Sequence, residues 1–263
     1  MKETSARRFS YVTLLGTDDY LIGTLCMAES LRNVKAQHPL LVLCSSSISS
    51  SSLKMLEKAG LDYMVLDGCI QVSGINKDGF ERWNYTFDKL QVFNLIQFDK
   101  VVFLDSDMFI AKNIDHLFDS PNMSAVVADV YDQPDCTELN SGLMVIEPTT
   151  IVYKGLLDVL SSDRFKQMPM FGDQDVIRAY FSDWSSKQEC RLPIGYNLFY
   201  PFMKEYCKAG GKKSDIYVVH FVYGTKPWHY SFGKLLKRTR KEGGSYLFRY
   251  ALLMIKFKLC YRT

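Results

Sequence analysis

VVFLDSD, at residues 101–107, is the stretch of sequence that decides the expected fold. Its four apolar residues, Val101–Leu104, predict a buried strand, and the acids of Asp105-Ser106-Asp107 follow where that strand ends. Ligands of open α/β sheets bind outside the carboxyl ends of the strands. Because two neighbouring carboxylates repel each other, we expect a hard divalent cation at this point, shared with substrate phosphates. The alternative is a solvated turn with two helix-capping acids.

Apolar runs and helical periodicity alternate on both sides of this strand. Strands are expected at residues 8–16, 40–44, 63–66, 125–128, 143–146 and 217–222, and helices at 21–31, 53–59, 87–98, 151–160 and 173–181. This alternation predicts an α/β fold, in which helices flank both faces of a mostly parallel, Rossmann-like sheet. The irregular, polar residues 68–85 are expected to form a lid or a binding loop.

Composition and charge indicate one folded domain with a basic tail. The 263 residues are 47% hydrophobic and 23% charged, as in globular proteins. We expect a domain at residues 1–233 and a basic amphipathic tail at 234–263. The tail holds nine Lys or Arg against one acid, a net charge of +8. Because the whole chain has a net charge of +3, the domain carries −5. Because the expected domain is acidic, nucleic acid is not an expected partner. Residues 246–261 would either lie on an anionic membrane surface or pack on the domain as a C-terminal helix.

The compartment is inferred from targeting signals and cysteines. The sequence predicts neither a signal peptide nor a membrane-spanning run. Its seven cysteines are an odd number without a CxxC pair, which argues against a disulfide framework or a zinc site. We expect reduced cysteines in a cytoplasmic protein, associated with a membrane if the tail binds lipid.

Four further features of the sequence carry polar side chains that suit a binding site. His220, within an apolar run, is either a metal ligand or a buried hydrogen-bonding residue. Lys226 could hold a phosphate as a point charge, or could be an ordinary exposed lysine before a turn. Asn140–Gly142 offers an amide and a hydroxyl to sugar hydroxyls but is also a common turn. Gly172–Asp175 begins a helix, where acids favour the helix dipole without any catalytic role.

Together and in this order, the motifs resemble glycosyltransferase family 8, in particular its glycogenin branch, and galactinol synthases share much of the pattern. The matching segments are VTLLGTDDY (12–20), TFDKLQVF (86–93), FLDSDMF (103–109), NSGLMVIEP (140–148), GDQD (172–175), LPIGYN (192–197) and HFVYGTKPW (220–228). The resemblance implies a single GT-A domain, a UDP-glucose or UDP-galactose donor, and Mn²⁺ or Mg²⁺ as cofactor. It also implies transfer of the hexose, with retention of configuration, to a glycan, protein or small polyol.

The resemblance implies roles for individual residues. The expected metal ligands are Asp105, Asp107 and His220, and Lys226 would hold the diphosphate. The residues expected to contact the donor or its metal are Leu14, Gly16, Tyr20, Lys89, Asp105, Ser106, Asp107, Asp129, Asn140, Ser141, His220, Gly224 and Lys226, the first three where the family contacts uridine. The residues expected to act in catalysis are Asp173, Gln174 and Lys226.

Departures from the family pattern leave alternatives open. Gly16 and Thr17 replace polar residues that glycogenins offer to the nucleotide, and the tyrosine-bearing acceptor segment of glycogenins is shortened here to Leu198–Pro201, with Tyr200 and Tyr206 as weak matches. We therefore expect a separate acceptor. We also expect attack from the leaving-group face, with a nucleophilic Asp as the alternative. A haloacid-dehalogenase-type phosphatase and a non-catalytic sugar-nucleotide-binding module are rival functions, and the sequence leaves a homodimer open.

Overall fold

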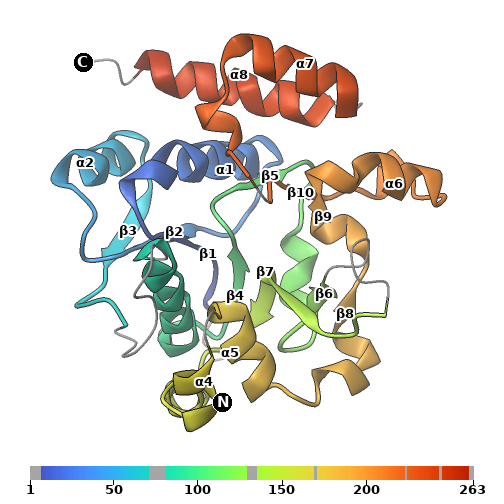
Figure 1. Ribbon diagram of the computed structural model, residues 1–263. Coiled ribbons are helices and arrows are strands. Elements are labelled where there is room, and N and C mark those ends of the chain that lie inside the picture. The colour runs from blue at the N-terminus through green and yellow to red at the C-terminus, as the bar shows by residue number, and fades with distance from the viewer. Residues whose placement is uncertain are drawn as a thin grey trace, which may run out of the picture.

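The centre of the molecule is a mixed sheet, as a computed structural model shows for residues 7–70, 81–128, 135–168, 171–222, 224–242 and 245–260. Within these residues, seven strands lie in the order β3-β2-β1-β4-β7-β6-β8 (Figure 1). They are β1 (Phe9–Leu15), β2 (Leu40–Cys44), β3 (Asp62–Val65), β4 (Lys100–Leu104), β6 (Ala125–Val127), β7 (Leu139–Ile146) and β8 (Arg191–Leu192). All neighbours are parallel except that β7 runs antiparallel to β4 and β6. The expected mostly parallel α/β sheet is confirmed.

Helices cover both faces of this sheet, because side chains alternate along each strand. Val12 and Leu14 of β1 pack into one apolar layer, and Leu15 packs into the other. The layer around Leu15 contains α1 (Leu21–Asn33), α2 (Ser50–Lys58), α6 (Met203–Lys208), α7 (Phe232–Glu242) and α8 (Ser245–Cys260). The opposite layer contains the 3-10 helix η2 (Glu81–Asn94), α3 (Thr150–Leu160), α4 (Asp163–Gln167) and α5 (Asp173–Tyr180). The two layers lie above and below the sheet in Figure 1.

A second, smaller sheet places His220 beside the two acids that follow β4. It consists of β5 (Met108–Ile110), β10 (Val218–His220) and β9 (Leu198–Phe199), in the order β5-β10-β9. β5 begins one residue after Asp107 and pairs antiparallel with β10, so that His220 lies opposite Met108. The late strand expected at 217–222 is therefore shorter than expected. β5 and β9 were not expected from the sequence.

Local structure differs from expectation around the binding loop. Residues 81–94 form a 3-10 helix, whereas an α-helix was expected at 87–98. Of the loop expected at 68–85, residues 81–85 belong to this 3-10 helix and residues 71–80 lie outside the described ranges. The remaining 3-10 helices are η1 (Asp18–Tyr20), η3 (Asp115–Asp119), η4 (Trp184–Ser186), η5 (Gln188–Cys190), η6 (Ile194–Tyr196), η7 (Tyr200–Phe202), η8 (Lys213–Asp215) and η9 (Pro227–His229).

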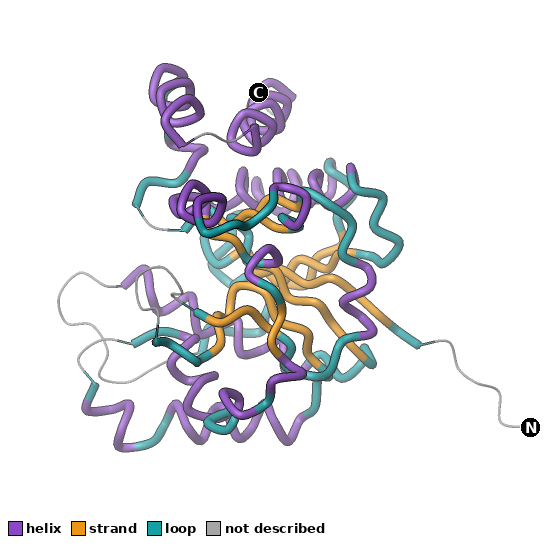
Figure 2. The backbone as a smooth tube through the Cα atoms, turned by 90° about the vertical axis from the view of Figure 1, so that its right-hand side faces the viewer, coloured by secondary structure: helices purple, strands orange, loops and turns teal. Residues whose placement is uncertain are grey.

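The last two helices form the outermost layer of the molecule. Figure 2, turned by 90°, shows α7 and α8 as a pair stacked outside the helices that cover the sheet. Among the residues described, no helix has both the length and the apolar character needed to cross a lipid bilayer. Free thiols are found, as expected, at Cys26, Cys44, Cys69, Cys136, Cys190 and Cys207.

Candidate active site

A cleft of about 360 Å³ opens where β4 ends. The residues that line it are Leu14, Gly16, Thr17, Tyr20, Tyr85, Thr86, Lys89, Asp105, Ser106, Asp107, Asp173, His220, Val222 and Lys226. They come from β1, η1, η2, α5, β10 and the segments after β1, β4 and β10. The carboxyl end of β4 thus holds the ligand-sized cleft that open α/β sheets are expected to have at this edge.

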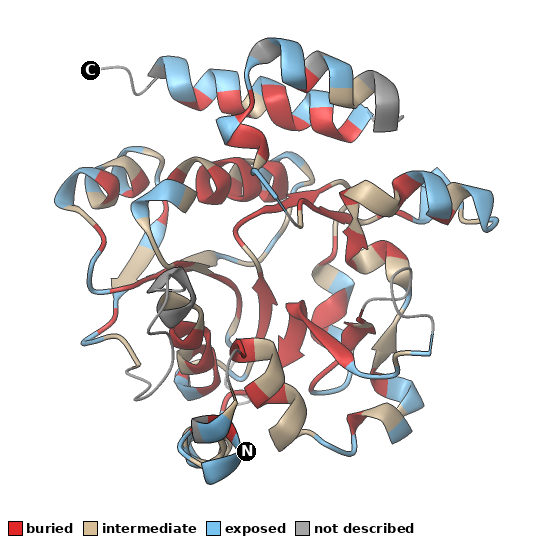
Figure 3. Cartoon of the chain, viewed as in Figure 1, coloured by how far each residue is buried: buried red, intermediate tan, exposed pale blue. Residues whose placement is uncertain are grey.

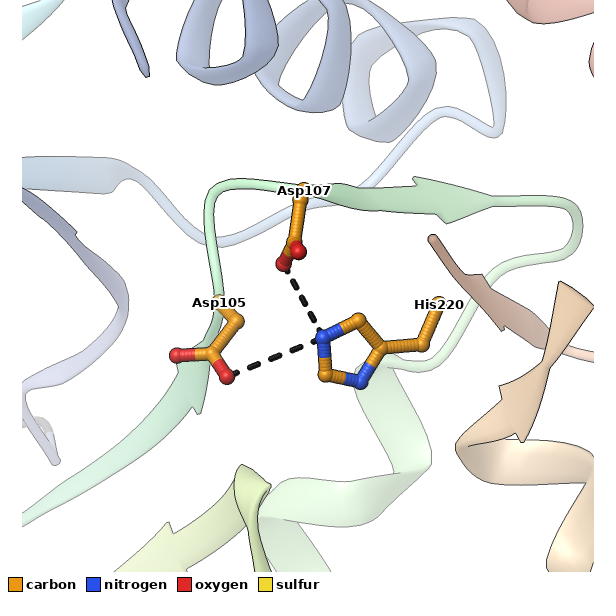
Figure 4. A group of neighbouring side chains, drawn as sticks. All are labelled: Asp105, Asp107 and His220. Carbon is orange, nitrogen blue, oxygen red and sulfur yellow. Dashed lines mark hydrogen bonds and ion pairs between the residues drawn. The ribbon is translucent and has the colours of Figure 1, made fainter. Parts of the chain in front are cut away.

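Two aspartates and one histidine converge inside the cleft (Figure 4). His220 Nε2 lies 2.9 Å from Asp107 Oδ1 and 3.8 Å from Asp105 Oδ2. One potential ligand atom from each of the three residues lies within 4.8 Å of the other two. Two carboxylate oxygens and an imidazole nitrogen at this separation can coordinate one divalent cation. The sequence prediction that these three side chains form one group is therefore met by the geometry.

A chain of hydrogen bonds sets the orientation of the His220 ring. The backbone N–H of Gly142 donates to Asn140 Oδ1 at 2.9 Å, so this atom is the amide oxygen. Asn197 Nδ2 donates to the same oxygen at 2.7 Å, which turns the Asn197 oxygen to His220 Nδ1 at 2.9 Å. Nδ1 therefore carries a proton, and Nε2 is directed to the carboxylate of Asp107. With Nδ1 protonated and the ring neutral, the lone pair of Nε2 would be available to a metal ion that Asp107 also binds.

Gly142 leaves the space that the ring needs. A Cβ at this position would lie 2.7 Å from His220 Cε1 and 2.9 Å from Asn140 Oδ1. The pairing of β7 with β4, in which Leu143 lies opposite Leu104, brings this glycine next to Asp105, whose N–H donates to the Gly142 carbonyl at 2.8 Å. The glycine of the Asn-Ser-Gly motif thus serves close packing.

Lys89 lies on the floor of the cleft between two acids. Its Nζ is 3.0 Å from Asp105 Oδ1 and 2.8 Å from Asp173 Oδ2. Burial would lower the pKa of Lys89, but the charges of the two aspartates outweigh it, and the pKa is raised. Ser141 Oγ donates to Asp173 Oδ2 at 3.0 Å, and the Ser141 N–H donates to Gln174 Oε1 at 3.0 Å. Ser141 and Gln174 thus support the floor, and Lys89 stays charged.

Lys226 lies on the opposite side of Asp107. Its Nζ is 2.6 Å from Asp107 Oδ2 and donates to the Phe221 carbonyl at 3.0 Å. Burial would raise the pKa of Asp107, but His220 and Lys226 outweigh it and lower the pKa. Burial raises the pKa of Asp105, against the charges of Lys89 and His220. Asp107 is therefore the more firmly ionised of the two acids.

The segment that carries Lys226 is fixed by an aromatic anchor. Trp228 is buried, and its ring meets that of Tyr20 edge to face at 5.3 Å. A Cβ on Gly23 of α1 would lie 2.6 Å from Trp228 Cη2, so the indole packs directly on this helix. The Lys-Pro-Trp sequence thus places the lysine by burying the tryptophan two residues later.

The helix-start motif at residues 172–175 divides its two acids between structure and site. The Gly172 N–H donates to Asp175 Oδ2 at 2.9 Å, so Asp175 caps α5. Asp173 instead turns into the cleft and contacts Lys89. The capping alternative therefore holds for Asp175 and not for Asp173.

Most of the expected donor-site residues line the cleft or lie directly behind it. Asn140 is buried behind His220, in the hydrogen-bond chain of Asn197. Gly224 is exposed and lies outside the lining, in the left-handed region at φ 55°. Asp129 falls outside the described residues. Five residues at the site were not expected from the sequence to take part in it: Thr17, Tyr85, Thr86, Val222 and Asn197. Asn197 ends the LPIGYN motif and could have been found there.

Comparison with known proteins agrees with this fold and site. The model of glycosyl transferase family 8 matches residues 11–231, and the chain belongs to this family. Mouse glycogenin-1 is 32% identical over 235 residues, with 87% of this chain and 68% of that protein covered. A putative UDP-glucuronate:xylan alpha-glucuronosyltransferase 4 of Arabidopsis thaliana is 30% identical over 84% of this chain and 37% of its own length. The solved galactosyltransferase LgtC, in complex with donor and acceptor sugar analogues, superimposes with a TM-score of 0.60 at 16% identity over 89% of this chain and 95% of that chain. The fold is thus of the GT-A type, and family membership disfavours the phosphatase alternative.

Proposed function

We propose that this glycosyltransferase moves a hexose, glucose or galactose, from a UDP-sugar to a hydroxyl acceptor in a reaction that depends on Mn²⁺ or Mg²⁺ and retains the anomeric configuration. The observation that carries the proposal is the convergence of Asp105, Asp107 and His220, with Lys226 alongside, in one cleft at the end of β4. A non-catalytic binding module has no need of this complete set.

The charges in the cleft favour a divalent cation and a diphosphate together. Among the lining residues that the structure describes, three carboxylates (Asp105, Asp107 and Asp173) face two ammonium groups (Lys89 and Lys226). We assign the metal to Asp105, Asp107 and His220 Nε2, where it would neutralise the charge that develops on the departing diphosphate. Lys226 holds a position from which its ammonium can donate to a phosphate oxygen instead of Asp107.

The walls of the cleft suit the two ends of a nucleotide sugar. Leu14, Gly16 and Val222 are apolar, and Tyr20 and Tyr85 offer rings, which suits a flat uracil base on this side. The polar floor around Lys89 and Asp173 suits the hydroxyls of a hexose. Ser141 and Gln174 hold that floor in place and are assigned as positioning residues.

The surroundings of Asp173 favour attack from the leaving-group face. Its Oδ2 accepts from both Lys89 Nζ and Ser141 Oγ, and these donors reduce the nucleophilicity of that oxygen. We therefore propose that the acceptor hydroxyl attacks on the face that the diphosphate leaves, with the diphosphate oxygens taking its proton. Intact-protein mass spectrometry during turnover tests this step, and a hexose covalently bound to Asp173 would overturn it.

The acceptor is proposed to be a separate molecule. Tyr200 and Tyr206, the two weak sequence matches to the glycogenin acceptor tyrosine, are both buried in the described structure. Neither hydroxyl is presented to a second active site without a rearrangement. A hexose found on either tyrosine after incubation with donor would refute this assignment.

A donor screen tests the proposed function as a whole. The protein is incubated with Mn²⁺ and each UDP-sugar in turn, and the release of UDP is followed with water as a slow acceptor. We expect release from UDP-glucose or UDP-galactose and loss of release on chelation of the metal. Nucleotide binding without turnover on any donor would support a non-catalytic module, and hydrolysis of generic phosphate esters would support a phosphatase.

A further inference from the structure

The C-terminal helix α8 has two apolar faces, and the domain covers one of them. Tyr250, Met254 and Phe257 are buried, and the Tyr250 ring lies 4.7 Å from that of Phe221. These residues belong to the apolar layer that includes α1. Figure 3 shows buried and exposed segments alternating along the outermost helices. This face accounts for the packing of the helix on the domain.

The other apolar face lies in solvent. Phe248, Leu252, Ile255 and Leu259 are 50, 51, 42 and 63% exposed. Their spacing of four, three and four residues places them in one stripe along the helix, on the side away from the buried face. Four of the seven exposed large hydrophobic side chains in the described part of the chain thus lie on one side of one helix. Scattered apolar residues need no explanation, but a continuous stripe indicates a binding surface.

Basic residues flank this stripe. On α8 itself, Arg249, Lys256 and Lys258 are exposed, and on the preceding helix α7, Lys234 and Lys237 are exposed. Lys256 forms an ion pair with Glu29. Residues 234–263 nevertheless hold nine basic residues against one acid, so this part of the sequence carries a net charge of +8.

We propose that α8 docks on an anionic lipid surface, with the stripe of Phe248, Leu252, Ile255 and Leu259 in the boundary between headgroups and acyl chains and the basic residues at the headgroups. An apolar stripe with flanking positive charge is the arrangement that binds in this plane. A second copy of this chain is a poor occupant, because it would bring two strongly positive surfaces together. The proposal is independent of the proposed function.

Vesicle binding tests the proposal with a matched control. The full chain is sedimented with phosphatidylcholine vesicles that contain no phosphatidylserine or about one-third phosphatidylserine. The variant Leu252→Glu/Ile255→Glu disrupts the stripe, and Ile151→Glu alters an apolar residue of α3 that is 81% exposed. We expect binding to the anionic vesicles to be at least about tenfold stronger than to the neutral ones and to weaken in high salt, and we expect the double variant to lose about tenfold or more. Ile151→Glu should bind as the unaltered chain does.

Other occupants of the stripe give different results. Equal binding of the double variant and the unaltered chain would overturn the proposal, as would equal binding to both kinds of vesicle. A dimer in solution that Leu252→Glu/Ile255→Glu abolishes, without vesicle binding, would show that the stripe is an interface between copies of the chain. Absence of both, with capture of an acidic protein, would assign the stripe to that class of partner. Circular dichroism and UDP release confirm that each variant is folded.

Discussion

Replacing Asp107 with Asn should remove activity while the fold remains. Asp107 is buried, and its two oxygens contact His220 Nε2 at 2.9 Å and Lys226 Nζ at 2.6 Å. The amide keeps the volume of the side chain but removes the charge that the proposed metal needs. Loss of one such group from a pre-organised site costs about 10²–10³ in rate, or roughly 3–4 kcal/mol of transition-state stabilisation. We expect at least this loss in kcat.

The effect on the free energy of unfolding should be much smaller. Breaking a fully buried ion pair costs about 3–5 kcal/mol, because the remaining charge has no partner. In the variant, Lys226 keeps its hydrogen bond to the Phe221 carbonyl and is partly exposed. Removing the charge of Asp107 also removes the repulsion between the Asp105 and Asp107 carboxylates. We therefore expect a cost of about 1.5–2 kcal/mol, at the low end of the range for one lost charged hydrogen bond.

A matched control separates the charge from its position. Asp99 precedes the opposite end of β4, where it accepts from the Arg8 N–H at 2.7 Å on the exposed surface. Asp99→Asn should leave kcat unchanged and cost less than about 1 kcal/mol. UDP release at saturating Mn²⁺ and donor, together with urea unfolding, measures both quantities. If Asp107→Asn turned over within about threefold of the unaltered enzyme, the role given to this carboxylate would be wrong.

Three further changes test the surroundings of the site and of the core. Lys226→Met should weaken UDP binding about tenfold. In the absence of nucleotide it should tighten Mn²⁺ binding, because the ammonium group that competes with the metal for Asp107 is removed. Calorimetry that showed weaker Mn²⁺ binding would contradict this. Gly142→Ala would place a Cβ 2.7 Å from His220 Cε1 and should lower Mn²⁺ affinity about tenfold. A Cβ on Gly68 would meet no atom within 4 Å, so Gly68→Ala should leave the Mn²⁺ affinity unchanged. Equal Mn²⁺ affinities of the two variants would refute the packing argument. Burial would raise the pKa of Asp115, but hydrogen bonds from a neighbouring asparagine and a buried tyrosine outweigh it, and the pKa lies below its ordinary 3.8. The ionised Asp115 therefore stabilises the fold above pH 3.8, and this stabilisation is lost as the pH falls through the lowered pKa. Asp115→Asn should cost about 1 kcal/mol of unfolding free energy in urea at pH 7, and this cost should shrink at lower pH. A cost that stays the same at every pH would contradict the argument.

The strand before the two acids could be predicted from sequence because its signal is local. Four apolar residues followed by a polar break describe β4, and the edge at which β4 ends contains the cleft. β5 could not be predicted, because three apolar residues are too short for a periodic pattern. It is nevertheless β5, by pairing with β10, that brings His220 to Asp107.

Contacts between residues far apart in the sequence could not be predicted from local sequence patterns. The ion pair between Lys89 and Asp173 joins η2 to α5 and depends on how both pack against the sheet. The role of Asn197 likewise depends on β9 lying beside β10, a contact between strands about twenty residues apart. For α8, the sequence left membrane contact and packing on the domain as alternatives, because both require an apolar face. The structure confirms the packing for one face and leaves the other free for the proposed lipid contact.

The most direct measurement of the central proposal is a crystal structure of the protein soaked with Mn²⁺ and UDP, with the anomalous signal of manganese recorded. We predict one strong anomalous peak within about 2.3 Å of Asp105, Asp107 and His220 Nε2, with the diphosphate on its open side and Lys226 turned from Asp107 to a phosphate oxygen. UDP bound in the cleft with no peak between these three side chains, or a peak elsewhere, would contradict the account.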